Sequence, residues 1–448
     1  MASNNKFRVV VVGGGPTGLT TAHALSKAGI DFVVLERRES IVEDLGASLV
    51  ISPDSLRALS QLGLLERLSS ISTGFRTLKT ATLEGIQYGT SNALATLEES
   101  AGALLRIFHR AQLVETLYDE LDDQAKARVF TNKKVVDIRS DEKGASVRCA
   151  DGTVYDGSIV IGADGAHSCV RKSMRQLALK KSPTADVDPE QPWSYEYRMI
   201  FFTFPKIPEL EAGSSIEAHG SDVSVQLLIA DNRAWMFVYE RMENPPTERV
   251  FYTQEDIGAY AAKWGHLSLT PTFKVRDAFA QRYNAGMVNL EEGMLKHYHW
   301  GRLVLVGDSA HKVTPNAGRG LNNGIQDSVA LVNEIQRLLT SEGGAKAQPN
   351  LDALDVAFER YQKTRQQMFK TDLEFSGRTT RMSAWKTWFL WFVDRWFMPM
   401  LPAWAETIMV GQMLAKRMGQ GLVFEFLKGE EPFQGKVPWT HPIMKKEV

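Results

Sequence analysis

The sequence contains few features of secreted, nucleic-acid-binding or metal-dependent proteins. Only two of its 448 residues are cysteines, Cys149 and Cys169, so a disulfide framework is excluded and a reducing intracellular compartment is expected. The formal net charge is −1, which provides no basic surface for nucleic acid. No apolar signal core precedes residue 7, so we expect no secretory leader. The nine histidines have no metal-ligand spacing, and we expect no metal.

The sequence also lacks an uncharged apolar run of the ~20 residues that a membrane-spanning helix needs. The nearest candidate is the segment 385–404, which holds half of the ten tryptophans but is interrupted by three charged residues. Five of its aromatic residues fall at helical spacing and form one stripe: Trp385, Trp388, Phe389, Phe392 and Trp396. The stripe indicates either a helix that packs on the body of the protein or an interfacial helix that lies on a membrane surface.

The apolar pattern at the start of the chain predicts a βαβ unit. Residues 7–12 are typical of a buried strand, residues 18–28 of a helix and residues 31–35 of a second strand. A further helix is predicted from Pro53 to Leu68, with Ser52 as its N-cap. These elements favour an α/β fold.

The middle of the chain has a different pattern. Residues 193–243 consist of strand-like runs separated by turn signals. Residues 302–306 return to a buried strand, and residues 320–340 predict a long helix. We therefore expect a strand-rich segment inserted between two parts of one α/β domain.

The first glycine-rich motif, GGGPTG at residues 13–18, joins the first predicted strand to the first predicted helix. Its glycines allow a tight turn and a close approach of the backbone to a pyrophosphate, and the helix N-terminus offers free N–H groups to phosphates. Glu36, at the end of the second strand, would accept hydrogen bonds from an adenosine ribose. Because all these parts occur in register, the motif predicts a dinucleotide site.

Two further motifs follow apolar strands. The sequence GADGAHS at residues 162–168 is, by itself, typical of a polar strand-to-helix turn with Ser168 as the helix N-cap. The other motif starts with GDSAH at residues 307–311 and continues to Asp327. Its Asp308 is placed to bind a sugar-like hydroxyl chain. The helix after residue 320 would point its positive end at a flat ring, as a negatively charged reduced flavin requires.

In this order and spacing, the three motifs resemble those of the group A flavoprotein monooxygenases, the aromatic-hydroxylase type, from about residue 7 to residue 340. The resemblance implies an α/β protein with an FAD-binding Rossmann-like domain, an inserted β-sheet-rich substrate domain and a helical C-terminal region. We expect the FAD-binding domain to comprise residues 1–180 and 285–345, the substrate domain residues 181–284, and the helical region residues 346–448.

The resemblance also implies which residues bind the cofactors. Asp164 would serve both FAD and NAD(P)H, Asp308 the ribityl chain, and Arg110 would reach FAD from the start of a helix. The glycine-rich motif and Glu36 would hold the ADP part, and the loop 315–322 would border the isoalloxazine ring. The complete expected set is Gly13, Gly15, Gly18, Glu36, Arg37, Gly46, Ala47, Arg110, Asp164, Asp308, Pro315, Gly318, Gly320, Leu321 and Asn322.

A narrower resemblance concerns residues 196–202, residues 290–328 and the apolar C-terminal third. They are similar to the fungal FAD-dependent epoxidases of indole-diterpene and meroterpenoid biosynthesis, which place an oxygen on a prenyl double bond. The family's catalytic arginine maps to Arg198. The tyrosine that accompanies it has no counterpart, because residues 199–238 contain no tyrosine, and His219 is the nearest polar ring. Arg198 is therefore either catalytic or part of a structural ion pair.

Missing motifs narrow the flavoenzyme class. The sequence has no CxxC pair, which argues against a disulfide reductase, and no second GxGxxG, which argues against Baeyer–Villiger and N-hydroxylating enzymes. It also has no WxWxxP of the flavin halogenases and no nucleophile elbow. These absences leave a group A flavoprotein monooxygenase as the favoured class.

We therefore predict that the protein uses FAD, NAD(P)H and O2 to epoxidise or hydroxylate a hydrophobic prenylated, terpenoid or meroterpenoid, intermediate through a flavin hydroperoxide. The pocket must be dry, because water promotes loss of hydrogen peroxide. Residues 193–284 are expected to wall it. The candidate wall residues are Phe201, Phe202, Leu227 and Phe237.

Three alternatives stay open. These are an aromatic ring hydroxylase of the salicylate-hydroxylase type, a flavin-dependent reductase of isoprenoid double bonds, and a non-catalytic nucleotide-binding membrane adaptor. No clear base for a phenol is visible in the sequence, which favours the alkene as the reacting group. The expected location is the cytoplasm, with residues 385–404 offering a peripheral contact with the endoplasmic reticulum membrane.

Overall fold

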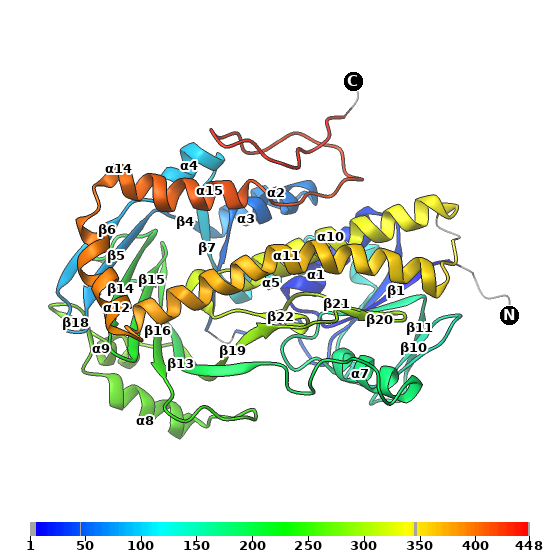
Figure 1. Cartoon of the computed structure of the whole chain (residues 1–448), viewed down its shortest axis with the longest axis horizontal. Helices are drawn as coiled ribbons and strands as arrows, with labels where there is room; N and C mark the ends of the chain where they lie inside the picture. Colours follow the sequence, from blue (N-terminus) through cyan, green and yellow to red (C-terminus); the bar gives the residue numbers. More distant parts are fainter. Residues whose placement is uncertain (1–5, 45, 345–346, 447–448) are drawn as a thin grey trace.

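The predicted βαβ unit forms the centre of a six-stranded sheet (Figure 1). The computed structural model describes residues 6–44, 46–344 and 347–446. The strands of this sheet, in spatial order, are β20 (His299–Trp300), β21 (Leu303–Leu305), β12 (Ile159–Gly162), β1 (Arg8–Val12), β2 (Asp31–Leu35) and β8 (Val129–Phe130). All neighbours are parallel except β20 and β21. The carboxyl ends of β1, β2, β12 and β21 therefore meet at one edge, where α/β proteins bind ligands.

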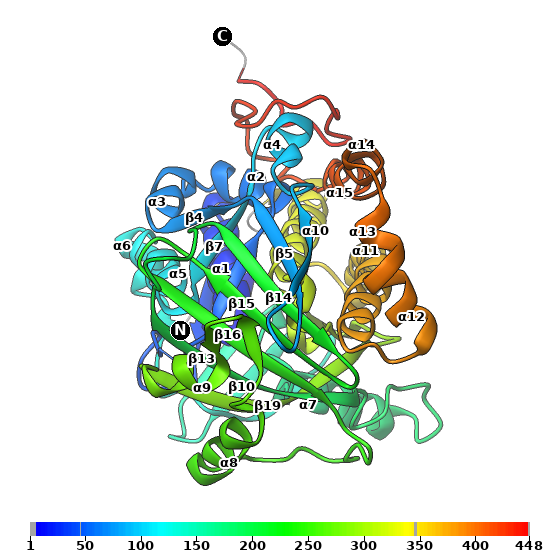
Figure 2. The same ribbon diagram turned by 90° about the vertical axis from the view of Figure 1, so that its left-hand side faces the viewer.

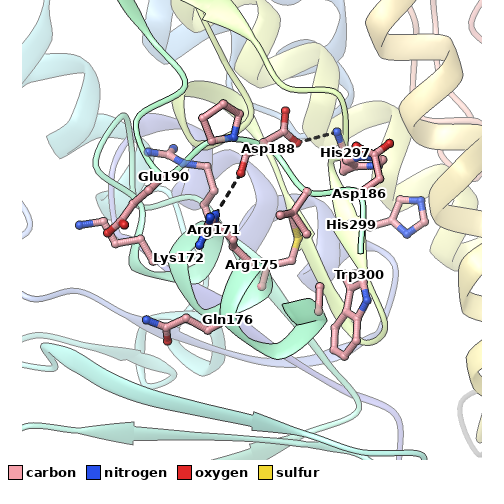
Figure 3. Close-up of a pocket in the computed structure, with 14 residues that line it drawn as sticks. Arg171, Lys172, Arg175, Gln176, Asp186, Asp188, Glu190, His297, His299 and Trp300 are labelled. Carbon is pink, nitrogen blue, oxygen red and sulfur yellow. Dashed lines mark hydrogen bonds and ion pairs between the residues drawn. The ribbon is translucent and has the colours of Figure 1, made fainter. Parts of the chain in front are cut away.

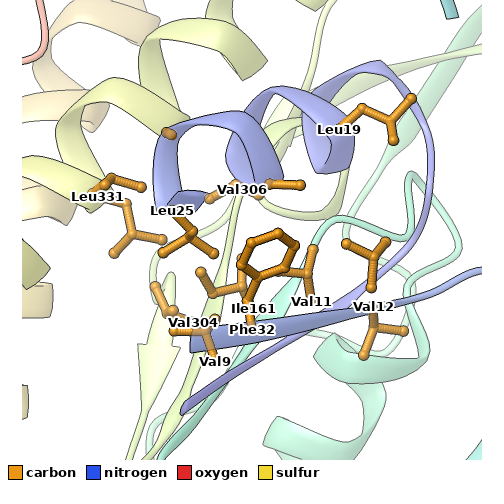
Figure 4. Close-up of a cluster of buried hydrophobic side chains, with 14 of the residues drawn as sticks. Val9, Val11, Val12, Leu19, Leu25, Phe32, Ile161, Val304, Val306 and Leu331 are labelled. Carbon is orange, nitrogen blue, oxygen red and sulfur yellow. The ribbon is translucent and has the colours of Figure 1, made fainter. Parts of the chain in front are cut away.

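The helix α1 (Pro16–Lys27) covers one face of this sheet. Its Leu19 and Leu25 lie over Val9, Val11 and Phe32, and all five side chains are buried (Figure 4). The run of valines in β1 suits a strand that is covered on both faces. The predicted α/β fold is thus present, and its core lies beneath the first glycine-rich motif.

A second, eight-stranded sheet carries the strand-rich middle of the chain. Its strands, in spatial order, are β22 (His311–Lys312), β19 (Asn284–Met294), β13 (Ser194–Pro205), β16 (Arg233–Arg241), β15 (Val223–Ile229), β14 (Ser214–Gly220), β5 (Thr77–Thr82) and β6 (Gln87–Ser91). Only β14 and β5 are parallel within it. The sheet thus recruits residues 77–91, 285–294 and 311–312 from outside the predicted substrate segment 181–284.

Opposite faces of this sheet have different neighbours. Phe202 and Leu227 lie in a buried cluster with residues of α8 (Gln254–Trp264) and α9 (Val275–Ala280). Phe237 belongs to another cluster, which includes Tyr239 and Met199. Because successive side chains of a strand alternate between faces, this separation follows from the position of each residue along its strand.

Smaller elements complete the region before residue 182. The strands β3 (Ser48–Ile51), β7 (Leu105–His109) and β4 (Ser72–Phe75) form one sheet, and β11 (Val154–Gly157), β10 (Ala145–Cys149) and β9 (Val135–Ser140) form another. The helices are α2 (Pro53–Gln61), α3 (Leu65–Ser70), α4 (Thr96–Ala101), α5 (Arg110–Asp119), α6 (Asp123–Lys126) and α7 (Cys169–Lys181).

The single helix predicted from Pro53 to Leu68 was wrong, because the chain breaks there into α2 and α3. Gly63 lies between them with φ +88°, a left-handed conformation that suits glycine and ends the first helix. Ser52 occupies the N-cap position of α2, but its hydroxyl donates to Asn322 at 2.8 Å instead of accepting a helix N–H.

Residues 351–418 are mostly helical, as predicted for the C-terminal region, whereas the described residues 419–446 form no helix. The helix α11 (Leu351–Ser383) runs beside α10 (Gly320–Ser341) across the molecule (Figure 1). Short helical pieces follow: α12 (Trp388–Phe392), η4 (Val393–Phe397), α13 (Met398–Met400), α14 (Ala403–Glu406), η5 (Thr407–Gln412) and α15 (Met413–Met418). The stretch from α11 to α13 lies beside the large sheet, where α11 contacts β14 and α13 contacts β6 (Figure 2). This region therefore flanks the large sheet.

The predicted aromatic stripe does not form one packed helix. Trp385 precedes α12 with φ +39°, and its indole N–H donates to Asp394 at 2.8 Å. Trp388 and Phe389, in contrast, are 75% and 58% exposed. The segment thus packs on the body of the protein through part of its residues, such as the buried Asp394, while much of the aromatic stripe stays exposed. Among the described residues, no helix combines the length and apolar character required to cross a bilayer.

A buried carboxylate connects the third motif to the two long helices. Asp327 of α10 is fully buried, and it accepts the N–H of Gly307 at 2.7 Å. His311 Nε2 and Arg365 Nε each lie 2.6 Å from its oxygens. Burial alone would raise the pKa of Asp327, but the charges of His311 and Arg365 outweigh it and hold the pKa at about 2.

We expect the change Asp327→Asn to lower the stability of the protein by about 3–5 kcal/mol, since it leaves Arg365 buried without its anion. A lower melting temperature in thermal scans at pH 7 would show this loss. The exposed Asp119 provides the control, and Asp119→Asn should change little. Equal melting temperatures for the two variants would contradict the role of Asp327.

Candidate active site

A cavity of about 1070 Å³ lies where the parallel strands end and the large sheet begins. Ligand pockets measure ~300–1,000 Å³, so this cavity lies at the upper end of that range. Most residues predicted to bind the cofactor line it. They are Gly13, Gly15, Glu36, Arg37, Arg110, Asp164, Asp308, Pro315, Gly318, Gly320, Leu321 and Asn322.

Three of the four glycines of the first motif, Gly13, Gly15 and Gly18, have different roles. Gly13 has φ +111°, and a Cβ there would lie 2.4 Å from the carbonyl oxygen of Ala163. A Cβ at Gly18 would lie 2.0 Å from the carbonyl oxygen of Gly13, so Gly18 permits close packing but does not line the cavity. Gly15 faces open space, with nothing within 4 Å of its Cβ position. Gly15 thus leaves room for a phosphate to approach the backbone.

Glu36 and Arg110 bring opposite charges to the cavity. Glu36 accepts the N–H of Gly14 at 2.7 Å and pairs with Arg38 at 2.9 Å. Burial alone would raise the pKa of Glu36, but these hydrogen bonds and the charge of Arg38 lower it. Arg110 has no ion pair within 4 Å among the described residues, and burial, together with Arg38, lowers its pKa. A cation without an ion-pair partner, in the same cavity as Gly15, suits a pyrophosphate.

The second motif is both a capped turn and a part of the cavity wall. Ser168 accepts the N–H of Arg171 at 2.9 Å, which confirms the predicted cap of α7. Asp164 Oδ2 accepts the N–H of Cys169 at 2.7 Å, whereas its buried Oδ1 has no partner among the described residues. Arg171 donates to the carbonyl oxygens of Ala166 and Ser309, and so ties this motif to the third.

The third motif surrounds the N-terminus of α10. Gly320 faces open space, and Gly318 has φ +63°. Asn322 uses its whole amide within the protein: Oδ1 accepts from Ser52, and Nδ2 donates to the carbonyl oxygens of Val50 and Gly318 at 2.8 and 2.7 Å. The hydrogen bonds of Asn322 thus fix the loop at the start of α10. The free N–H groups of this helix N-terminus lie at the cavity and favour negative charge there.

The chain matches known proteins over most of its length. The FAD binding domain family matches residues 6–200 and 232–353. The FAD-dependent monooxygenase srdH of Neurospora crassa is 30% identical over 98% of this chain and 99% of its own, and the FAD-dependent monooxygenase ausM of Penicillium brasilianum is 33% identical over 82% and 77%. The solved structure of Klebsiella pneumoniae HpxO, complexed with FAD and uric acid, has a TM-score of 0.72, 18% identity and coverage of 91% and 97%.

The chain belongs to the FAD-dependent monooxygenases. It is thus an oxidoreductase of the predicted group A kind, and FAD is its cofactor. This assignment excludes the non-catalytic adaptor. The likeness to HpxO shows the fold, and it confirms the expected FAD-binding architecture.

The cavity of the monooxygenase fits FAD by its own chemistry. Asp164 offers a buried acceptor without a partner among the described residues, and Arg110 offers a cation. Gly15 and Gly320 leave space at the two ends where the backbone must approach a ligand closely. These residues would hold FAD in this cavity.

Two further residues predicted to bind the cofactor, Gly46 and Ala47, do not line the cavity. The carbonyl oxygen of Gly46 accepts the hydroxyl of Thr203 at 2.7 Å, and that of Ala47 accepts the N–H of Arg110 at 3.1 Å. The adjacent residues 48–50 line the cavity instead. Gly46 and Ala47 therefore hold the starts of β3 and α5 in place.

Arg198 lies outside the cavity of the monooxygenase. It pairs with Glu240 at 2.7 Å, across from it on β16, and its guanidinium lies over Tyr260 of α8. Met199, the next residue, shares the opposite face with Tyr239, which lines the cavity. Of the two interpretations of Arg198, this geometry favours the structural ion pair. The sequence motif identified the strand correctly. Because successive side chains of a strand point to opposite faces, however, the side chain of Arg198 points away from the cavity.

The apolar part of the cavity is built by segments that the sequence did not single out. Of the predicted wall residues, only Phe237 lines it. The other apolar lining residues include Leu78, Leu94, Leu105, Leu228, Phe375, Met382, Met398, Leu401, Val410, Met413 and Leu414. Most come from residues 78–105 and 375–414, so the wall combines the large sheet with the C-terminal helices. A largely apolar wall therefore lies in the same cavity as the loop 315–322.

A second cavity, of about 90 Å³, lies between α7 and the segment 186–190 (Figure 3). Several of its polar groups already have partners within the protein. Asp188 accepts from Arg175 through its backbone carbonyl, and its carboxylate accepts the N–H of His297 at 2.9 Å. A space of this size holds a few water molecules, not a nucleotide. The large cavity thus remains the active-site candidate.

We expect the change Glu36→Ala to lower the FAD content of the purified monooxygenase, because the ribose loses a charged acceptor. A hydrogen bond to a charged group contributes ~1.5–3 kcal/mol, which corresponds to roughly 10- to 100-fold weaker binding. The absorbance of bound flavin relative to protein measures occupancy. Glu39→Ala, at an exposed position nearby, should retain full occupancy. Full occupancy in Glu36→Ala would refute the assigned role.

Proposed function

We propose that this monooxygenase epoxidises a hydrophobic prenylated compound, a terpenoid or meroterpenoid, with NAD(P)H and O2. The large apolar chamber in the same cavity as the loop 315–322 is the observation that carries this proposal. A long isoprenoid chain needs such a surface, since each buried CH₂ contributes about 0.8 kcal/mol. The resemblance of residues 290–328 to fungal epoxidases supports the choice of reaction.

The proposed reaction converts an alkene, O2, NAD(P)H and a proton into an epoxide, NAD(P)+ and water. Bound FAD would take the hydride from NAD(P)H and activate O2, so that one oxygen atom becomes electrophilic. The alkene gains that atom, and the second oxygen leaves as water. No protein base is needed to remove a proton from an alkene.

The side chains of the chamber orient the substrate and exclude water. Leu228 and Phe237 of the sheet face the cavity from one side, and Met382 and Leu414 from the C-terminal helices. This enclosure disfavours loss of hydrogen peroxide, which water promotes. The N-terminus of α10 stabilises negative charge at the loop 315–322 without a mobile side chain.

A panel experiment tests the reaction. We expect farnesylated aromatics to accelerate the anaerobic reduction of bound FAD by NADPH or NADH, and to yield, in air, a product heavier by one oxygen atom. Oxygen-18 gas should label that atom, and NMR should locate it on a former prenyl double bond.

Other products would contradict epoxidation in distinct ways. Hydroxylation of unprenylated salicylate would support the aromatic hydroxylase instead. A product that gains two hydrogens without oxygen consumption would support the isoprenoid reductase. If no prenylated compound accelerates reduction, the proposed substrate class fails.

We further propose that the outer surface of residues 385–404 contacts a lipid bilayer, as a cytoplasmic enzyme peripheral to the endoplasmic reticulum would. Trp388, Phe389 and Trp404 are exposed there, and tryptophan favours the bilayer interface. An exposed apolar patch of this kind marks an interaction surface. Met398 and Leu401 of the same segment line the chamber, which would shorten the route of a lipophilic substrate from bilayer to cavity.

The double change Trp388→Ser with Phe389→Ser should weaken co-sedimentation with vesicles of phosphatidylcholine and phosphatidylserine. A second double change, Phe251→Ser with Tyr283→Ser, removes two exposed aromatic residues elsewhere and should leave sedimentation unchanged. The bilayer proposal fails if wild type does not sediment with vesicles, or if both double variants sediment equally.

A further inference from the structure

One polar cluster interrupts the apolar chamber. Glu217 and His219 lie two residues apart on β14 and therefore share a face of the large sheet. Tyr88 of β6 and Asp394 of η4 complete the cluster, and all four residues line the cavity. Burying charged groups among apolar residues costs free energy, so we ask what function these four residues serve.

His219 carries a positive charge between two carboxylates. Its Nδ1 lies 2.9 Å from Asp394 Oδ2, and its Nε2 lies 3.4 Å from Glu217 Oε2. Both ring nitrogens can donate only in the protonated imidazole. Burial alone would lower the pKa of His219, but Asp394 and Glu217 raise it to about 9. With two carboxylates and one imidazolium, the cluster has a net charge of −1.

The two carboxylates are used to different extents. Asp394 Oδ2 accepts from Tyr88 at 2.6 Å and from the indole of Trp385 at 2.8 Å, besides its pairing with His219. Asp394 therefore anchors the C-terminal segment to the sheet. Glu217 accepts one hydrogen bond from Gln226, at 2.8 Å, and has the longer contact with His219. A carboxylate has about four acceptor positions, so Glu217 retains some that face the cavity.

Glu217 also lies close to the loop that borders the expected ring site. Gln226 Nε2, which donates to Glu217, lies 3.5 Å from the carbonyl oxygen of Asn316. The hydroxyl of Tyr239 donates to Gln226 Oε1 at 3.1 Å and fixes the amide. One residue thus separates the Glu217 carboxylate from the loop 315–322. A group bound at Glu217 would be held at a set distance from the reacting region.

We propose that Glu217 recognises a hydroxyl or N–H group of the substrate and so selects which double bond faces the flavin. The inference rests on the proposed function and adds the polar part of the substrate to it. The net negative charge of the cluster disfavours anionic substrates and suits a neutral donor. Glu217 is thus a specificity-determining residue, while His219 and Asp394 position it.

The test uses the FAD-loaded enzyme and two probes, a farnesylated phenol and its O-methyl ether, which cannot donate. Titration of the flavin absorbance gives the Kd of each probe. We expect wild type to bind the phenol roughly 10- to 100-fold tighter than the ether. In Glu217→Leu the ratio of the two Kd values should fall to about one, and Glu217→Gln, which keeps a neutral acceptor, should lie between.

Glu240→Gln is the matched control, because Glu240 is a buried carboxylate on the opposite face of the same sheet. Its Kd ratio should equal that of wild type. The inference is overturned if wild type binds both probes equally, or if Glu217→Leu keeps the wild-type ratio. Should Glu217→Leu fail to fold, an unchanged ratio in Glu217→Gln overturns it.

Product analysis on the same samples separates this inference from the proposed function. If wild type prefers the phenol but oxygenates neither probe, the proposed function fails and the recognition role stands. If both probes are epoxidised with equal Kd values, the epoxidation stands and the role of Glu217 fails.

Discussion

The buried carboxylate of Asp327 holds together the parts on which the rest of the site depends. It accepts the N–H of Gly307, faces His311 and pairs with Arg365 of α11. The loop after β21 is thereby attached to α10 and α11. Because α10 begins at the cavity, any shift of this carboxylate would move the helix N-terminus that favours negative charge there.

The cavity of this monooxygenase has two chemically different ends. One end collects the carboxyl ends of parallel strands, with Gly15, Asp164 and Arg110 arranged for a charged dinucleotide. The other end is apolar and lies between the large sheet and the C-terminal helices. The loop 315–322 lines the same cavity, and Gln226 connects it to Glu217 of the large sheet.

The C-terminal segment connects the chamber with the outer surface. Asp394 fixes it to the sheet through Tyr88 and His219. Its inner residues, such as Leu401, line the cavity, and its outer residues, such as Trp404, are exposed. The proposed bilayer contact and the proposed lipophilic substrate therefore involve the same segment.

The sequence alone determined the α/β fold, the cofactor and most of the residues at the dinucleotide end. These features depend on local order: a strand, a glycine turn, a helix and Glu36 follow one another directly, so spacing is sufficient. The sequence could not place Arg198. Successive side chains of a strand point to opposite faces of the sheet, so a shift of one residue decides whether a side chain faces the cavity or the outer face. Nor could the sequence bring together Glu217, Tyr88 and Asp394, which lie far apart in the chain. Only the tertiary structure, through sheet pairing and helix packing, decided those contacts.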